Sequence, residues 1–156
     1  RALGNRSIIA DPRDRGMHER LNGRLGRDNL MPFAPIMSEA AARRFLVGWQ
    51  PADRNSRYMT RTYSTCRGFA ERFPACVHID GTVRPFVVCN HSDLFLAEIL
   101  DAWESIADAG VLINTSFNLH GRPIVERSLD VIKAVEIGVV DLCIVQEQCI
   151  LSRNRG

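Results

Sequence analysis

The fold of this chain is decided by residues 111–125, Val111-Leu112-Ile113-Asn114-Thr115-Ser116-Phe117-Asn118-Leu119-His120-Gly121-Arg122-Pro123-Ile124-Val125. The stretch begins as an apolar run typical of a buried strand and changes at Asn114 to small polar side chains. Gly121 and Pro123 then stop regular structure. Ligands of open α/β sheets bind where buried strands end. The stretch therefore predicts a ligand site, with an ordinary polar turn at the strand end as the alternative.

Amphipathic helices are expected on both sides of this stretch. The helix before it is capped by Ser92 and closed by Gly110, and the helix after it is capped by Ser128 and closed by Gly138. The first carries Leu96, Ile99, Leu100, Trp103, Ile106 and Ala107 on one face, and the second carries Val131, Ile132 and Val135. Two further helices are expected, from Met17 until Pro32 and from Ser38 to Phe45.

Short apolar runs predict the remaining strands. They are residues 8–10, the extended stretch 32–37, an edge strand in 58–65, the runs 76–79 and 83–88, and the last two at 139–145 and 149–151. The turn Asp80-Gly81-Thr82 favours a hairpin between 76–79 and 83–88. The sequence therefore predicts an α/β domain, with an α+β mixed sheet and flanking helices.

Length and composition are those of one ordinary globular domain. The 156 residues are 46% hydrophobic and 24% charged, which predicts a single domain over residues 1–151 and a polar tail at 152–156. The chain has neither an apolar run of about 18 residues nor a signal-peptide pattern. We therefore expect no membrane partner and a cytoplasmic location.

The cysteines and the basic residues indicate which ligands the domain could bind. The five cysteines show no CxxC spacing, so we expect reduced core thiols and no metal site. Lys133 is the single lysine beside nineteen arginines, whose planar guanidinium groups suit carboxylates and phosphates, although genome composition also explains such a bias. The net charge of +2 is too small to argue for nucleic acid.

Polar clusters at the ends of elements are the candidate sites. In the predicted hairpin, strand alternation brings His78, Asp80, Thr82 and Arg84 into a small volume that could hold a phosphate, or a cation beside one. The alternative is a turn in which Asp80 bonds the backbone and pairs with Arg84. The sequence contains no catalytic-triad order, HExxH, GxxxxGK or GxGxxG motif.

Five ordered motifs resemble the C-terminal domain of the NodU/CmcH-type carbamoyltransferases. They are residues 1–7 (RALGNRS), 10–14 (ADPRD), 32–35 (PFAP), 78–84 (HIDGTVR) and 114–125 (NTSFN…GRPIV). The resemblance implies a YrdC-like domain that binds ATP and carbamoyl phosphate, forms carbamoyl adenylate and releases pyrophosphate, with Mg²⁺ carried on ATP. It also implies a larger N-terminal domain of the actin and sugar-kinase type, which transfers the carbamoyl group to an acceptor hydroxyl.

The chain starts at Arg1 without an initiator methionine, so we expect that N-terminal domain to be absent from it. The resemblance assigns roles only at matching positions. Three residues are expected to be catalytic, namely Arg84, Ser116 and Asn118. Eight are expected to bind ATP or carbamoyl phosphate, namely Arg6, Ser7, Arg27, His78, Asp80, Thr82, Asn114 and Thr115.

The chain departs from the family pattern at Leu25, Met31, Phe86 and Arg122. Arg24 or Arg122 could restore the lost positive charge and give altered anion geometry, or the site could be degenerate. Two other classes of function stay open, an RNA-binding module and a docking domain without chemistry. Convergence of arginines with residues 114–118 in one pocket would favour the enzyme, and a broad basic stripe would favour RNA.

Overall fold

A four-stranded mixed sheet forms the centre of the molecule. The computed structural model describes residues 3–27, 32–89, 93–145 and 149–152. The strands are β1 (Ser7–Ala10), β2 (Ala34–Ser38), β5 (Phe86–Val88) and β6 (Val111–Ser116), in the order β1-β6-β2-β5. β6 is antiparallel to both neighbours, whereas β2 and β5 are parallel. The predicted mixed sheet with flanking helices is therefore confirmed.

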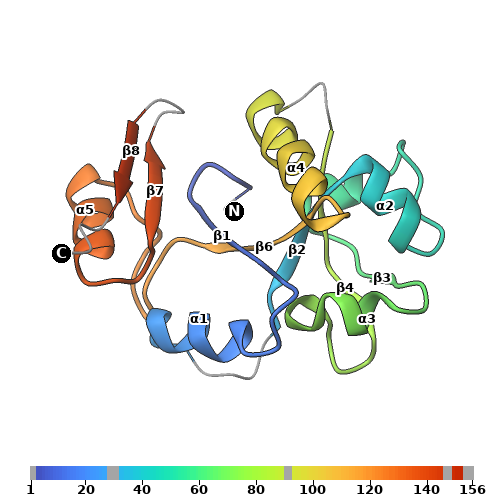
Figure 1. The fold of residues 1–156 in the computed structure, drawn as a ribbon, viewed down its shortest axis with the longest axis horizontal. Helices are drawn as coiled ribbons and strands as arrows, with labels where there is room; N and C mark the ends of the chain where they lie inside the picture. The colour runs from blue at the N-terminus through green and yellow to red at the C-terminus, as the bar shows by residue number, and fades with distance from the viewer. Residues whose placement is uncertain (1–2, 28–31, 90–92, 146–148, 153–156) are drawn as a thin grey trace.

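Two helices cover opposite faces of this sheet (Figure 1). α4 (Leu94–Ala107) packs on the face that carries Leu112, and α1 (Met17–Leu25) packs on the face that carries Ile113. Successive strand residues point to opposite faces, so the apolar run of β6 supplies both cores. This is why residues 111–113 read as an uninterrupted apolar run rather than an alternating one.

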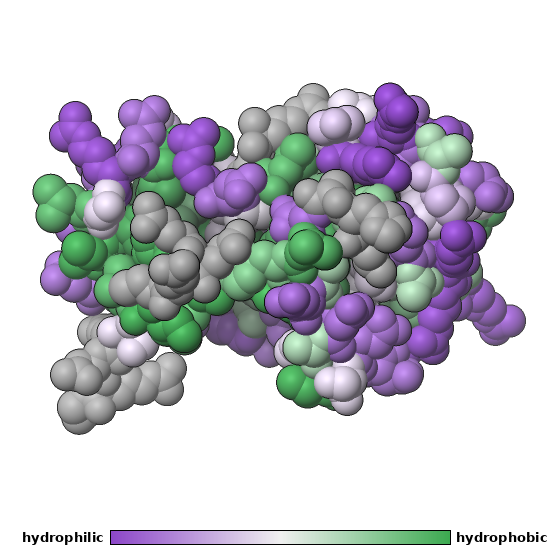
Figure 2. All heavy atoms as spheres, turned by 90° about the horizontal axis from the view of Figure 1, so that it is seen from above, coloured by the Kyte–Doolittle hydropathy of each residue, from purple (hydrophilic) through white to green (hydrophobic). Residues whose placement is uncertain are grey.

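The remaining elements form two flanking units. On one side, α2 (Glu39–Phe45), α3 (Phe69–Arg72) and the small sheet of β3 (Tyr63–Ser64) and β4 (Thr82–Val83) enclose an aromatic core. There are also 3₁₀ helices at Arg54–Tyr58 and Pro74–Cys76, and Ala75 and Cys76 of the second pack in the core that contains α1 and α5. On the other, α5 (Ser128–Glu136) packs beside the hairpin β7 (Leu142–Val145) and β8 (Cys149–Ser152). Figure 2 shows hydrophobic side chains gathered over the α5, β7 and β8 side. None of the helices in the described ranges is long and apolar enough to cross a membrane.

The ends of α1, α4 and α5 differ from the sequence prediction. α1 ends at Leu25, not at Pro32, because Gly26 adopts a left-handed φ of 64°. α4 is closed by Asp108 at φ 55° rather than by Gly110, and it is capped by Asp93, whose carboxylate accepts from Leu96 N. Ser92 lies outside the described residues. Ser128 is the first residue of α5 and not its cap, which is Arg127.

The predicted hairpin between residues 76–79 and 83–88 is wrong. Residues 74–76 form a 3₁₀ turn, and the second run divides into two strands with different partners. β4 pairs with β3, and β5 pairs with β2. Pro85 lies between them, and its missing N–H prevents a continuous ladder through this point. Only the tight turn itself is present, since His78 N donates to the Thr82 carbonyl at 2.9 Å.

Strand limits also differ. β6 continues through Ser116, so the polar segment starts inside an antiparallel strand and not after it. The edge strand expected over 58–65 is only Tyr63–Ser64, and β7 begins at Leu142 instead of Val139. β8 includes Ser152, which the sequence placed in the tail. The Ser38 cap is confirmed, since its Oγ accepts from Ala41 N at 3.1 Å.

Candidate functional site

The turn that ends α1 directs the side chain of Arg27 toward the end of β6. Gly26 N donates to the Gly23 carbonyl at 3.2 Å, and Arg27 N donates to the Asn22 carbonyl at 2.9 Å. These two bonds form a Schellman motif around the left-handed Gly26. His120 N also donates to the Leu25 carbonyl at 2.9 Å, which ties the loop after β6 to this helix end.

The side chain of Arg27 gathers three other predicted residues. Its Nη1 donates to Thr115 Oγ1 at 2.7 Å. Its Nη2 donates to Ser116 Oγ at 3.1 Å and to Asn118 Oδ1 at 2.8 Å, and also to the main-chain oxygens of both residues. We call Arg27, Thr115, Ser116 and Asn118 the Arg27 cluster. It joins residues that are about ninety positions apart in the chain.

The electrostatics of the Arg27 cluster favour an anion. All five of these hydrogen bonds end on neutral oxygens, so none of them brings a carboxylate to the guanidinium. Burial lowers the pKa of Arg27, because removal from water disfavours the charged form. A partly buried positive charge that is oriented by neutral groups gains most from a nearby phosphate or carboxylate.

Asn118 holds the loop around this arginine. Its Oδ1 accepts from Ser116 Oγ, and its Nδ2 donates to the carbonyls of Leu119 at 3.2 Å and Arg122 at 3.1 Å. Both the oxygen and the nitrogen of the Asn118 side-chain amide are therefore hydrogen bonded. Arg122, which replaces the acidic residue of the family pattern, has an exposed side chain, and its main chain is fixed by this turn.

Arg6 and Ser7 lie at the same end of the sheet. Ser7 is opposite Ser116 in the β1–β6 register, and Phe117 N donates to the Arg6 carbonyl at 2.9 Å. The Arg6 side chain reaches the Val125 carbonyl at 3.4 Å, and Ser7 Oγ accepts from Gly4 N at 3.0 Å. The two residues are thus next to the Arg27 cluster without a hydrogen bond to Arg27 in the described structure.

His78, Asp80 and Thr82 come together in a turn of their own. Asp80 Oδ1 accepts from Thr82 N at 2.9 Å and from Thr82 Oγ1 at 2.7 Å. These bonds lower the pKa of Asp80, the backbone bond most, and the ring of His78 lies 3.1 Å from Thr82 Oγ1. This is the Asx-type turn of the alternative, but the ion pairs of the described residues do not include the expected pair of Asp80 with Arg84.

Arg84 and Asn114 are separate from the Arg27 cluster. Arg84 is exposed just before β5, whose parallel register with β2 puts it near the sheet end where β6 finishes. Asn114 is buried, and its Nδ2 lies 3.5 Å from Met59 Sδ. It points to the opposite sheet face from Thr115, because neighbouring strand residues alternate.

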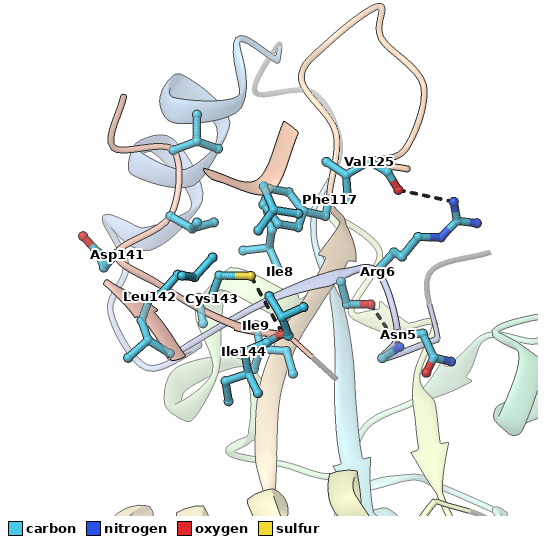
Figure 3. Close-up of a pocket in the computed structure, with 18 of the residues that line it drawn as sticks. Asn5, Arg6, Ile8, Ile9, Phe117, Val125, Asp141, Leu142, Cys143 and Ile144 are labelled. Atoms are coloured by element: carbon cyan, nitrogen blue, oxygen red, sulfur yellow. Dashed lines mark hydrogen bonds between the residues drawn. The ribbon is translucent and has the colours of Figure 1, made fainter. Parts of the chain in front are cut away.

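A cavity of about 1090 Å³ lies beside β1 and was not predicted from the sequence. Arg6 and Ser7 line it, together with Phe117, which follows Ser116, but the Arg27 cluster lies outside it. Figure 3 shows Ile8 and Ile9 of β1 with Leu142, Cys143 and Ile144 of β7 around this space. Its lining is mainly apolar. The sequence signal that could have indicated this cavity is the concentration of aliphatic residues in the strands predicted at 139–145 and 149–151.

Within the described ranges, no three His, Cys, Asp or Glu side chains come together as a possible metal-ligand set. Cys66 and Cys76 are free cysteines. Cys76 is fully buried, and this burial raises the pKa of its thiol.

The fold and the Arg27 cluster together define a mixed α/β domain with a partly buried arginine site at one end of its sheet. The chain belongs to the carbamoyltransferase C-terminus family, whose model matches residues 1–153. It is 37% identical over 122 residues to nodulation protein U of Azorhizobium caulinodans, covering 78% of this chain and 21% of that protein. It is 32% identical over 133 residues to nodulation protein NolO of Bradyrhizobium diazoefficiens, covering 85% of this chain and 24% of the relative.

An uncharacterized protein of Methanocaldococcus jannaschii is also similar, at 37% identity over 134 residues, 85% of this chain and 21% of the relative. The chain thus spans about a fifth of the length of the curated relatives that it matches. The family match therefore covers nearly the whole length of this chain.

Proposed function

We propose that this domain activates the carbamoyl group in an O-carbamoyltransferase, by binding ATP and carbamoyl phosphate and forming carbamoyl adenylate. In this reaction a carbamoyl oxygen forms a bond to the α-phosphorus of ATP, and pyrophosphate leaves. The phosphate of carbamoyl phosphate is released with uptake of one water. Membership of the carbamoyltransferase C-terminus family supports the class of reaction.

The observation that carries the proposal is the Arg27 cluster. Both reactants are anions with phosphate groups, and Arg27 is a partly buried cation held only by neutral oxygens in its five bonds. Phosphoryl chemistry depends on positioning and on stabilising charge that develops at phosphorus. Among the described residues Arg27 is the one arginine whose side chain bonds to residues 115–118, and the Arg27 cluster lies outside the cavity beside β1, so a pocket of several arginines is not what favours an enzyme over a basic stripe for RNA. Membership of the carbamoyltransferase C-terminus family favours it instead.

In this proposal each predicted residue keeps its role. Ser116 and Asn118 are proposed to orient the reacting oxygens, and Arg84 is proposed to reach them from the start of β5, which is separated from β6 by β2 in the sheet. Arg6 and Ser7 lie beside them and complete the anion site with Thr115. His78, Asp80, Thr82 and Asn114 are proposed to bind the remainder of ATP. Mg²⁺ would be bound by phosphate oxygens of ATP and would neutralise part of their charge.

The transfer of the carbamoyl group to an acceptor hydroxyl belongs, in this proposal, to a larger actin and sugar-kinase type part of the polypeptide. The chain spans about a fifth of its relatives, which leaves ample length for such a part. The two steps would then be divided between two parts of one enzyme.

The test is carbamoyl-phosphate-dependent exchange of labelled pyrophosphate into ATP, measured on the full-length enzyme that carries this chain. Ser116→Ala, Arg84→Ala and Arg27→Lys should each lower the exchange by about a hundredfold or more, a typical loss for one oriented charge or donor. Arg67→Lys, at an exposed arginine before α3, should keep the wild-type rate.

Unchanged exchange in all three variants would refute the site. Absence of any exchange in the wild-type enzyme, together with RNA affinity that falls steeply with salt, would replace the proposal with the nucleic-acid alternative. If no exchange occurs, and neither ATP nor carbamoyl phosphate raises the unfolding temperature, the remaining alternative is a docking domain that has no chemistry of its own.

A further inference from the structure

The charges of this chain are separated along the sequence. Residues 43–73 contain seven arginines and two acidic residues, which gives this segment a net charge of +5. Residues 85–121 contain five acidic residues and no lysine or arginine, which gives a net charge of −5. Genome composition explains why the basic residues are arginines, but it does not explain where the charges are placed. The small net charge of the chain is therefore the sum of segments with large and opposite charges.

Arginines at the end of α2 and in the 3₁₀ helix Arg54–Tyr58 are linked through one tryptophan. The guanidinium carbon of Arg43 lies 5.8 Å from the centre of the Trp49 ring. Trp49 Nε1 donates at 2.9 Å to Ser56 Oγ, which belongs to the 3₁₀ helix. Figure 2 shows hydrophilic side chains gathered over this side of the molecule. We call the exposed arginines of these two elements the basic patch, namely Arg43, Arg44 and Arg54.

The outer face of α4 carries negative charge. Leu94, Glu98 and Asp101 recur at i, i+4 and i+7, and Ser105 follows on the same side of the helix, so we call these four exposed residues the α4 face. Glu98 and Asp101 take part in none of the ion pairs of the described residues. Leu94 is 68% exposed, and Ile106, which the sequence placed on the buried side of this helix, is 73% exposed. The α4 face is therefore acidic and has exposed apolar side chains beside its carboxylates.

The basic patch and the α4 face meet at the C-terminal end of α4. Asp108 closes this helix, and its Oδ2 accepts from Arg72 Nη2 at 2.9 Å. The Asp108 carbonyl accepts from Arg44 Nη1 at 3.2 Å. Figure 1 shows α2 beside this end of α4. A two-fold rotation about an axis near Asp108 would lay the α4 face of each copy on the basic patch of the other, which is the self-complementary contact of a symmetric dimer.

The α4 face favours a second copy over other partners of the basic patch. A nucleic acid or an anionic membrane would be attracted by the arginines but repelled by the carboxylates beside them. A second copy presents both signs of charge in the complementary arrangement, and such charges orient two partners as they meet. Exposed apolar side chains accompany both surfaces, since Val47 and Tyr58 of residues 43–73 are 59% and 57% exposed. They offer apolar contacts to Leu94 and Ile106 of the other copy.

We propose that two copies of this chain associate through a symmetric contact, in which the α4 face of each copy lies on the basic patch of the other. The contact includes no member of the Arg27 cluster and no other residue that we propose to bind ATP or carbamoyl phosphate. The inference therefore goes beyond the proposed function and does not depend on it.

The test is sedimentation velocity of the full-length enzyme at about 0.01 M and about 1 M salt, where charges are screened over about 30 Å and about 3 Å. The wild type should be a dimer at low salt and should dissociate at high salt. Glu98→Arg combined with Asp101→Arg should weaken the association by about tenfold or more, because like charges then face each other. Arg43→Glu combined with Arg54→Glu should have the same effect for the same reason.

An equimolar mixture of these two double variants provides the sharpest measurement. Each reversed face then meets a face of opposite sign, so a mixed dimer should form although neither variant dimerises alone. Glu19→Arg combined with Glu136→Arg is the matched control, because both residues are exposed and lie on α1 and α5. The control makes the same change in net charge and should dimerise like the wild type. Thermal melts show whether each variant is folded.

Several results would overturn the contact. They are a wild type that stays monomeric at low salt, double variants that dimerise like the wild type, and a mixture that stays monomeric. An equal loss of association in the control would also overturn it, since net charge and not the two faces would then govern association. A monomeric wild type that binds single-stranded RNA, with an affinity lost in Arg43→Glu, would assign the basic patch to nucleic acid instead.

Discussion

Arg27 Nη2 donates to both oxygens of Asn118, to the main-chain oxygen at 3.1 Å and to Oδ1 at 2.8 Å, across 91 positions of the sequence. One guanidinium thus fixes the loop after β6 to the end of α1. The same bonds orient the side chains of the proposed anion site, so stability and function share this contact.

Replacement of Arg27 by Gln should therefore destabilise the domain even without ligand. Several partly buried oxygens of Thr115, Ser116 and Asn118 would lose their donor, at a cost of about 1–3 kcal/mol in the free energy of unfolding. Urea denaturation of the wild type and the variant measures this difference. Arg67→Gln, at an exposed site, should stay within about 0.5 kcal/mol of wild type, and an equally small change for Arg27→Gln would contradict the structural role.

Gly26 is required by its left-handed φ of 64°, although its Cβ position has no atom within 4 Å. Gly26→Ala should lower the free energy of unfolding by about 1–2 kcal/mol, because an L side chain is strained in this conformation. Gly23 lies inside α1, also with free space around it. Gly23→Ala should instead stabilise the protein by about 0.5–1 kcal/mol. Opposite signs in thermal melts of the two variants are the expected result.

Gly110 is required for a different reason, its close approach to the cap of α2. A Cβ at Gly110 would lie 2.6 Å from Ser38 Oγ and 3.0 Å from Ser38 Cβ, while Ser38 N donates to the Gly110 carbonyl at 2.9 Å. Gly110→Ala should cost about 1–3 kcal/mol through this clash. Ser38→Gly removes both clashing atoms and loses only the cap bond. The double variant should then be less destabilised than the sum of the single changes, and strict additivity would show that the clash is elsewhere.

Tyr63 should ionise at a higher pH than an ordinary tyrosine. Its hydroxyl donates to Asp53 Oδ2 at 2.6 Å, and burial together with this carboxylate raises the pKa of Tyr63 to about 12 from 10.0. A group with a raised pKa stabilises the fold fully below its unfolded value, so this contribution is present up to about pH 10 and is lost between about pH 10 and 12. The chain has two tyrosines. Absorbance at about 295 nm should show an ionisation step near pH 12, and Tyr63→Phe should remove that step; a step near pH 12 that persists in the variant would contradict the assignment.

The hydrogen bond between Tyr63 and Asp53 also affects the stability of the fold at low pH. The Tyr63 hydroxyl is the main cause that lowers the pKa of Asp53 from its ordinary value. Stability from this carboxylate is present above about pH 4 and is lost as the pH falls through the lowered pKa. Tyr63→Phe should therefore also reduce the loss of stability on acidification, which urea midpoints between about pH 5 and 2 would measure.

The sequence by itself determined the mixed α/β class, the family and four members of the Arg27 cluster. The sequence was sufficient where the local pattern of side chains agrees with the structure that the segment adopts in the fold. Met17, Leu21 and Leu25 show the helical period of α1, and Ser38 has the side chain that a helix cap needs. The motif residues 114–118 stand together in the chain, so their closeness did not depend on folding.

Only the tertiary structure decided which strands pair and which motifs meet. The run 83–88 looks like one strand, but Pro85 divides it between β3 and β2 as partners. His78, Asp80 and Thr82 satisfy one another in their own turn, whereas Arg27 crosses to β6 because Gly26 reverses the chain. Pairing and convergence depend on contacts between residues far apart in sequence, and no local pattern of propensity or hydrophobic period contains that information.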